Sequence, residues 1–172
     1  MSRRLLGRPT GKLIVIIIGL AVALAVLTPT AALATPPDTF RIPVEGTFID
    51  EGASAACGFD VLFEQSGIET IQVLYDAAGN PIRVQVHKNI TGTVSANGIT
   101  LREIEHGQVF YDLVEGTETD IGLVFRIFLP GGGTAIADVG RLVFDAEGNV
   151  TFEAGPHPAL HGDFAALCAA LS

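Results

Sequence analysis

The chain has 172 residues, 48% of them hydrophobic, and a formal net charge of −9. Nineteen acidic but only six basic residues follow position 34, so residues 35–172 carry a formal charge of −13. A surface this acidic repels phosphate backbones and anionic lipid headgroups, which argues against nucleic-acid binding and docking on membrane surfaces. The apolar content excludes a mainly disordered chain, and the length predicts one domain.

Residues 1–34 have the pattern of a secretory signal peptide. Four basic residues precede an apolar run at residues 13–27, and a small-residue site follows at residues 32–34. The run is shorter than the roughly 20 residues that span a bilayer comfortably. We therefore predict cleavage after Ala34, secretion, and no membrane attachment afterwards. An uncleaved N-terminal membrane anchor is the alternative.

After a flexible mature N-terminus at residues 35–41, short apolar stretches alternate with turns rich in glycine and asparagine. Because connections this short cannot cross over to a parallel neighbour, the strands must be mainly antiparallel. We predict one all-β domain over residues 42–172, an antiparallel barrel of eight to nine strands, with a two-sheet sandwich as the alternative. The expected strands are residues 42–49, 59–65, 68–75, 82–94, 99–105, 109–114, 121–129, 134–144 and 150–153.

Two turns and the C-terminal tail have patterns of their own. Residues 76–80 and 145–149 both read D-A-x-G-N after two aliphatic residues and an aromatic one, which indicates one turn geometry used twice. In the tail, Phe164, Leu167 and Leu171 lie on one helical face. We predict a short C-terminal helix that packs against the sheet.

The two cysteines, Cys57 and Cys168, both lie in the mature part of the chain. In an oxidising compartment they most simply form one disulfide. The alternative is a nucleophilic or metal-binding thiol. The apolar sequence around Cys168 would raise the pKa of a free thiol and leave it inert, which favours the disulfide.

The stretch at residues 82–94 is the best candidate wall of a binding site. Apolar residues share one face, and the polar residues on the other face form either a solvated surface or the lining of a barrel lumen. Lys88 falls on the apolar face, so we predict a bulge beside it; a lysine inside the lumen is the alternative. The polar residues are Arg83, Gln85, His87, Asn89, Thr91 and Thr93.

Arg83, His87 and Glu105 are the candidate ligand-binding residues, and no catalytic residue, cofactor or metal site is predicted. Glu103 and Glu105 would share a face of one strand, which we interpret as a solvated edge. His157 and His161 are four residues apart, but prolines on both sides of His157 exclude the helix that would pair them on zinc.

Five short motifs stand out in the mature chain: F-x-x-x-L-P-G-G-G from Phe125, D-x-G-R-L-V-F-D from Asp138, F-E-x-G-P-H from Phe152, D-F-x-x-L-C from Asp163 and C-G-F from Cys57. Together they resemble a group of small exported proteins common in actinobacteria and their neighbours. The resemblance implies a barrel similar to allene oxide cyclases or lipocalins, and it carries over no residue roles.

The leading expectation for function is an exported barrel that binds a small apolar ligand without catalysis, or that has a role at the cell envelope. An enzyme of the isomerase or cyclase kind, with the barrel cavity shaping its substrate, is one alternative. An envelope module that acts only by surface contact is another. Its barrel would be filled by Phe48, Phe59, Phe125 and Phe144.

Overall fold

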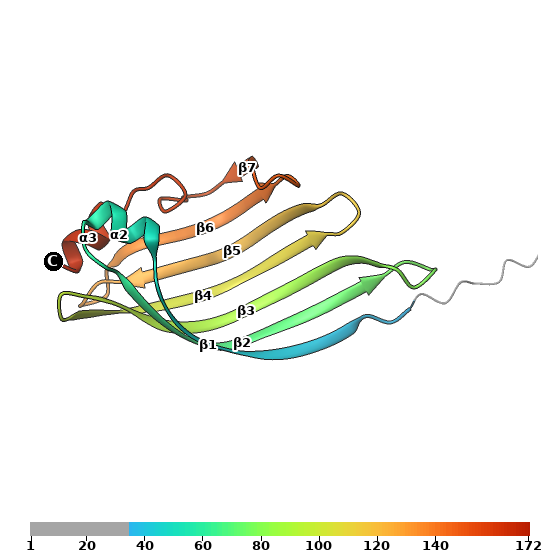
Figure 1. The fold of residues 1–172 in the computed structure, drawn as a ribbon, viewed down its shortest axis with the longest axis horizontal. Coiled ribbons are helices and arrows are strands. Elements are labelled where there is room, and N and C mark those ends of the chain that lie inside the picture. Colours follow the sequence, from blue (N-terminus) through green and yellow to red (C-terminus); the bar gives the residue numbers. More distant parts are fainter. Residues whose placement is uncertain (1–34) are drawn as a thin grey trace, which may run out of the picture. The chain divides into compact units, whose positions relative to one another are not determined.

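A computed structural model describes residues 35–172, all but the predicted signal peptide, which lies outside the described residues. Seven antiparallel strands form one sheet, in which each strand pairs with the next along the chain (Figure 1). The predicted all-β character is confirmed. The strands are β1 (Asp38–Ile49), β2 (Leu62–Tyr75), β3 (Pro81–Ala96), β4 (Ile99–Asp112), β5 (Thr117–Phe128), β6 (Thr134–Phe144) and β7 (Val150–Ala154).

The sheet is open, so the predicted closed barrel is not found, nor is the second sheet of a sandwich. Within residues 35–172, β1 pairs only with β2, and β7 pairs only with β6. Closure requires the two edge strands to run alongside each other. With 5 residues, β7 is too short to match the 12 residues of β1. The first strand begins at Asp38, before the position expected from the sequence.

Two strands are longer than predicted, which reduces nine expected strands to seven. The breaks expected near Gly67 and Gly107 do not exist, and both glycines lie inside continuous strands, β2 and β4. A side chain at Gly67 would collide with the backbone of Asn89 and Ile90 in β3. Glycine is therefore present here because two backbones approach closely, and not because the chain turns.

The two D-A-x-G-N segments form the same turn, as predicted. Asp76 Oδ1 accepts hydrogen bonds from the amides of Ala78 and Asn80, each 2.8 Å long. Asp145 makes the equivalent contacts in the turn before β7. Gly79 and Gly148 have φ angles of 85° and 82°, which glycine adopts without strain. These turns fix the β2–β3 and β6–β7 hairpins.

Two short helices, α2 (Glu51–Cys57) and α3 (Ala165–Ala170), lie together at one end of the sheet (Figure 1). We call the sheet face that they cover the inner face and the opposite one the outer face. Leu167 and Leu171 pack with inner-face side chains such as Val94 and Ile127, and all four are at most 1% exposed. Of the aromatic residues expected to fill the interior, Phe59 and Phe125 pack against this core, whereas Phe48 is 45% exposed.

Helix α3 was predicted from the sequence, whereas α2 was not. The buried stripe of Phe164, Leu167 and Leu171 confirms the C-terminal helix. Helix α2 begins where the carboxylate of Asp50 accepts a hydrogen bond of 2.7 Å from the amide of Ala53. It ends at Gly58, which has a φ of 76°. Aspartate before and glycine after a run of small residues are ordinary helix-boundary signals.

The predicted disulfide is confirmed and joins the two helices. Cys57, the last residue of α2, bonds to Cys168 in α3 across 111 residues. The disulfide is compatible with an extracellular protein. Neither helix of residues 35–172 is long and apolar enough to cross a membrane.

Removing the disulfide should destabilise the fold strongly. The crosslink restricts the unfolded chain and holds two helices too short to persist alone. We expect the double variant Cys57→Ser/Cys168→Ser to lose about 2–5 kcal/mol of unfolding free energy, measured by urea denaturation. Adding reductant should lower the wild-type midpoint toward that of the variant and leave the variant unchanged. Equal midpoints for the two proteins without reductant would contradict this expectation.

Candidate binding site on the outer face

Strand β3 carries a row of six polar side chains on the outer face of the sheet. On its inner face, Val86, Ile90 and Val94 are buried, so the alternation predicted from the sequence is confirmed. At about 3.3 Å per residue, the row is roughly 33 Å long. We call Arg83, Gln85, His87, Asn89, Thr91 and Thr93 the polar row.

Lys88 lies on the inner face, and β3 has no bulge beside it, so the predicted bulge is wrong. The pairs His87–Gln108 and Ile90–Glu105 keep the same register with β4 on both sides of Lys88. The ammonium group of Lys88 is 3.8 Å from Glu105 Oε2. This ion pair, together with Glu69 directly opposite on β2, gives the Lys88 charge acidic partners on the inner face, so no bulge is required to expose it.

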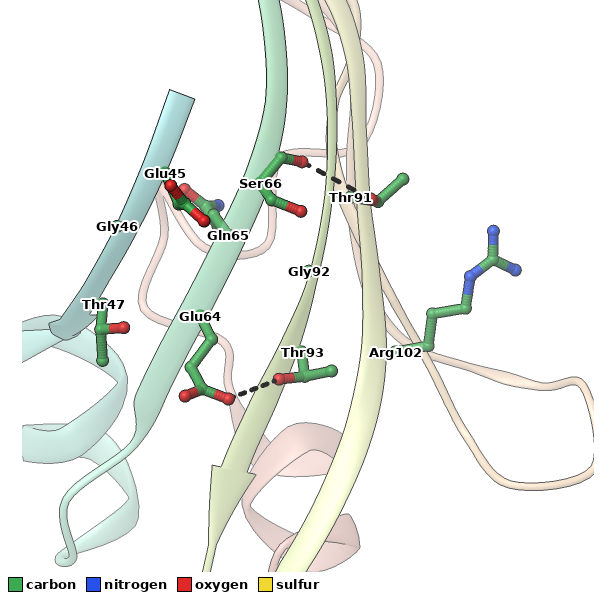
Figure 2. A pocket seen from close by; sticks show the side chains of 10 residues that line it. All are labelled: Glu45, Gly46, Thr47, Glu64, Gln65, Ser66, Thr91, Gly92, Thr93 and Arg102. Carbon is green, nitrogen blue, oxygen red and sulfur yellow. Dashed lines mark hydrogen bonds between the residues drawn. The ribbon is translucent and has the colours of Figure 1, made fainter. Parts of the chain in front are cut away.

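One end of the polar row opens into a hollow of about 550 Å³, the upper hollow (Figure 2). Glu64 accepts a hydrogen bond of 3.4 Å from Thr93 Oγ1, and Thr91 Oγ1 donates one of 3.5 Å to the Ser66 carbonyl. The wall of the upper hollow contains hydroxyl groups, carboxylates and one guanidinium group, and the strand backbone, including that of Gly46 and Gly92, forms its floor. These polar groups belong to Thr47, Ser66, Thr91, Thr93, Glu45, Glu64 and Arg102.

The other end of the polar row leads to a second hollow of about 360 Å³, the lower hollow. Strands β3, β4, β5 and β6 all contribute outer-face side chains to it. It combines two guanidinium groups and one carboxylate with threonine hydroxyls and an apolar floor. The lining residues are Arg83, Phe110, Asp112, Thr117, Thr119, Ile121 and Arg141.

Between the hollows, the polar row is linked sideways to β4. The amide nitrogen of Gln85 lies 2.7 Å from His87 Nε2 and 3.3 Å from Gln108 Oε1. His87 is half-buried and Asn89 is exposed. The outer face therefore presents hydrogen-bonding groups over the whole distance from one hollow to the other. Such an arrangement can hold an extended polar molecule.

The inner face contains a buried pair of carboxyl groups, which corrects the interpretation of Glu103 and Glu105 as a solvated edge. The Glu103 side chain is only 1% exposed. The amide of Gln65 donates a hydrogen bond of 3.0 Å to Glu103 Oε1 and one of 2.6 Å to Glu105 Oε1. Glu103 lies opposite Gly92 of β3, whose missing side chain leaves room for the Glu103 carboxyl group.

Burial, the neighbouring charge of Glu105 and a hydrogen bond with Glu105 raise the pKa of Glu103 to about 7, although the hydrogen bond from Gln65 opposes the shift. Burial also raises the pKa of Asp120 and of Asp138 on the same face. A carboxyl group with a pKa near neutrality can act as a general acid or base. Glu103, however, is enclosed, so no substrate can reach it in this conformation.

The three predicted site residues do not come together. Arg83 and His87 lie on the outer face, whereas Glu105 pairs with the buried Ile90 and points to the inner face. Arg83 has its own acidic neighbour, with Nη2 3.7 Å from Asp112 Oδ2. The residues of the polar row were thus identified from the sequence, but Asp112, the acidic neighbour of Arg83 on β4, was not.

The two histidines of the C-terminal segment, His157 and His161, differ in exposure. His157 is 2% exposed, while the exposed His161 lies 2.7 Å from Glu153 Oε1. Within residues 35–172, no group of three or more His, Cys, Asp or Glu side chains is placed to hold a metal ion.

Sequence reasoning missed Gln65 and the second arginine of the lower hollow, Arg141. Each reaches its site through strand pairing: Gln65 lies 38 residues from Glu103. Gln65 did carry a signal, because a polar residue at the inner-face position two after the buried Phe63 breaks an apolar alternation.

Comparison with known proteins finds no matching family model, no matching curated protein and no matching solved structure.

Gly92→Ala should destabilise the protein. Its new methyl group would collide with the Glu64 carbonyl and lie 2.7 Å from Glu103 Oε2. We expect a loss of about 2–4 kcal/mol in unfolding free energy, measured by denaturant titration. Gly46→Ala is the matched control, since nothing lies within 4 Å of the methyl group it would add. Equal effects of the two substitutions would show that strand propensity, rather than close approach, is responsible.

Glu103 should make stability fall as pH rises toward neutrality. Its pKa is raised from 4.5 to about 7, so its protonated form favours folding; this contribution is complete below about pH 4.5 and is lost as pH rises through about 7. Glu103→Gln stays neutral and should keep roughly 1–3 kcal/mol that the wild type loses between pH 5 and pH 8. The measurement is urea denaturation of both proteins across this interval.

Glu147→Gln in an exposed turn serves as the control. It should follow the wild-type profile. Parallel profiles for the wild type and Glu103→Gln would refute the assignment.

Proposed function

We propose that the protein is an exported, non-catalytic binding module that holds an extended polyhydroxylated chain, such as an envelope polysaccharide, on its outer face. The single observation that carries the proposal is the polar row of β3, which joins the upper and lower hollows. Hydroxyl, amide and carboxylate groups in such a row can exchange hydrogen bonds with successive sugar hydroxyls.

The location on strands supports binding more than catalysis. The strands that carry the polar row and most of the lining of the hollows are paired on both sides, so the polar row and the two hollows are preformed and little conformational entropy is lost on binding. Glu103, whose raised pKa would suit a general acid or base, is enclosed with Glu105 on the opposite face from both hollows. An isomerase or cyclase role therefore has less support than binding.

A small apolar ligand inside a barrel stays a prediction from the sequence. Two observations favour binding on the outer face instead. The helices fill one end of the inner face, and the two hollows of the outer face are open and lined with polar groups. A module that binds a polymer by surface contact is consistent with the cell-envelope role expected from the sequence. The resemblance to small exported actinobacterial proteins also stays a prediction.

Binding to immobilised polysaccharides tests the proposal. Residues 35–172, with the disulfide intact, are passed over neutral galactomannan and acidic polygalacturonate in a biolayer interferometer. We expect binding to at least one polymer, and we expect the double variant Thr91→Val/Thr93→Val to weaken it by about tenfold through lost hydrogen bonds.

Thr134→Val, at an exposed position at the start of β6, is the matched control and should bind like the wild type. The absence of binding to either polymer, or equal loss in the Thr134 and Thr91/Thr93 variants, would overturn the proposal.

A further inference from the structure

Charge is divided unequally between the two faces of the sheet. Residues 35–172 contain six basic residues, and strand register places all five arginines on the outer face and Lys88 on the inner face. The inner face has most of the strand carboxyl groups: Glu69, Glu103, Glu105, Glu118, Asp120 and Asp138. A chain that is strongly acidic as a whole therefore has one locally basic face.

Two of the five arginines converge on the lower hollow. Arg83 comes from β3 and Arg141 from β6, with the outer-face side chains of β4 and β5 between them. Asp112 is the carboxylate that lines the same hollow, so the charged side chains of the lining sum to a positive value. Two guanidinium groups gathered around one open space favour an anion between them.

Both guanidinium groups have hydrogen-bond donors free for a ligand. Arg83 lies 3.7 Å from Asp112 and its side chain is 52% exposed, so this ion pair is loose. The other oxygen of Asp112 accepts two amide hydrogen bonds of 3.0 Å from the following turn, from Val114 and Glu115. The carboxylate is thus fixed by the backbone and does not enclose Arg83.

Arg141 is held by an aromatic ring and makes no ion pair within residues 35–172. Its guanidinium carbon lies 5.4 Å from the centre of the Phe152 ring. A guanidinium group that stacks on a ring keeps its N–H edge available, and this edge matches a carboxylate, sulfate or phosphate.

The rest of the lower hollow fits a sugar ring that carries the anion. Thr117 and Thr119 supply hydroxyl groups, and Phe110 and Ile121 supply an apolar surface. A sugar ring has hydroxyl groups at its rim and an apolar face, so it can meet both kinds of wall. The polar row begins at Arg83 and continues to the upper hollow, along the path of a longer chain.

We propose that the lower hollow binds the anionic group of an acidic polysaccharide, with Arg83 and Arg141 on either side of the anion. This inference rests on the proposed function and gives its ligand a chemical class. Uronate carboxylates, sulfate esters and phosphodiesters share the required chemistry. The experiment compares these three sources.

The test uses the variant Arg83→Gln/Arg141→Gln on residues 35–172. Polygalacturonate, dextran sulfate and a phosphodiester-containing teichoic acid are immobilised beside neutral galactomannan. Wild-type protein should bind at least one anionic polymer at least about tenfold more tightly than galactomannan, and the variant should lose this preference. The preference should also weaken as salt rises from 50 to 500 mM by roughly an order of magnitude. Arg41→Gln, on the outer face but outside both hollows, should behave like the wild type.

Titration with short oligomers of the three anionic polymers, trigalacturonate among them, monitored by the side-chain NMR signals of the arginines, separates this inference from the proposed function. Shifts at Arg83 and Arg141 without polymer binding would support the anion site and reject the polysaccharide module. Polymer binding with no such shifts, no anionic preference, or an equal loss in Arg41→Gln would overturn the anion site alone. If neither polymer binding nor arginine shifts are observed, both the polysaccharide module and the anion site are overturned. If duplex DNA binds as tightly as the anionic polymers, the attraction is non-specific and the anion site is overturned.

Discussion

The close approach of β2 and β3 at Gly67 and Gly92 is the constraint on which the rest of the structure depends. At these positions a side chain would collide with the backbone of the neighbouring strand. With no side chains to separate them, the backbones pack tightly. The space above Gly92 on the inner face is taken by the Glu103 carboxyl group, and its outer side forms part of the floor of the upper hollow.

This constraint explains why polar groups lie where a continuous apolar core would be expected. The helices cover one end of the inner face and bury an apolar cluster that includes Val94 and Leu101. Next to this cluster, the missing side chain at Gly92 leaves room for a large side chain at the paired position of β4. Glu103 fills this space, and Gln65 satisfies both this carboxyl group and that of Glu105. A buried carboxyl group with a hydrogen-bond donor costs much less than one left unpaired.

The parts of the structure that local pattern determines were predicted, and the parts that pairing determines were not. The alternation of β3, the repeated turn at Asp76 and Asp145, and the disulfide follow from short-range chemistry or from the count of cysteines. Gly67 was ambiguous, because glycine marks both a turn and a close backbone approach, and only the neighbouring strand distinguishes them. The prediction of a closed barrel was wrong for a similar reason. Closure depends on the length of β7 and on its distance from β1, and the local sequence specifies neither.

Only the part of the candidate site that lies on a single strand could be predicted from the sequence. Arg83 and His87 were recognised because they alternate with buried residues on one strand. Arg141 stands 58 positions from Arg83 in the sequence and reaches the same hollow only through the consecutive pairing of β3, β4, β5 and β6. Glu105 was grouped with the wrong face because its parity relative to His87 depends on the register between β3 and β4. A shift of one residue in this register would have placed the Glu105 side chain on the outer face.

The unequal charge of the two faces also limits the kind of polymer that the proposed site can hold. At physiological ionic strength charges are screened beyond about 8 Å, so an approaching chain responds to the outer face more than to the formal charge of the whole protein. The outer face has arginines, but in the upper hollow Glu45 and Glu64 outnumber Arg102. A chain with an anion at every unit would gain at the lower hollow and lose part of that gain at the upper one. A chain with few anions and many hydroxyl groups avoids that loss. The arrangement therefore favours polysaccharides whose anionic groups are widely spaced.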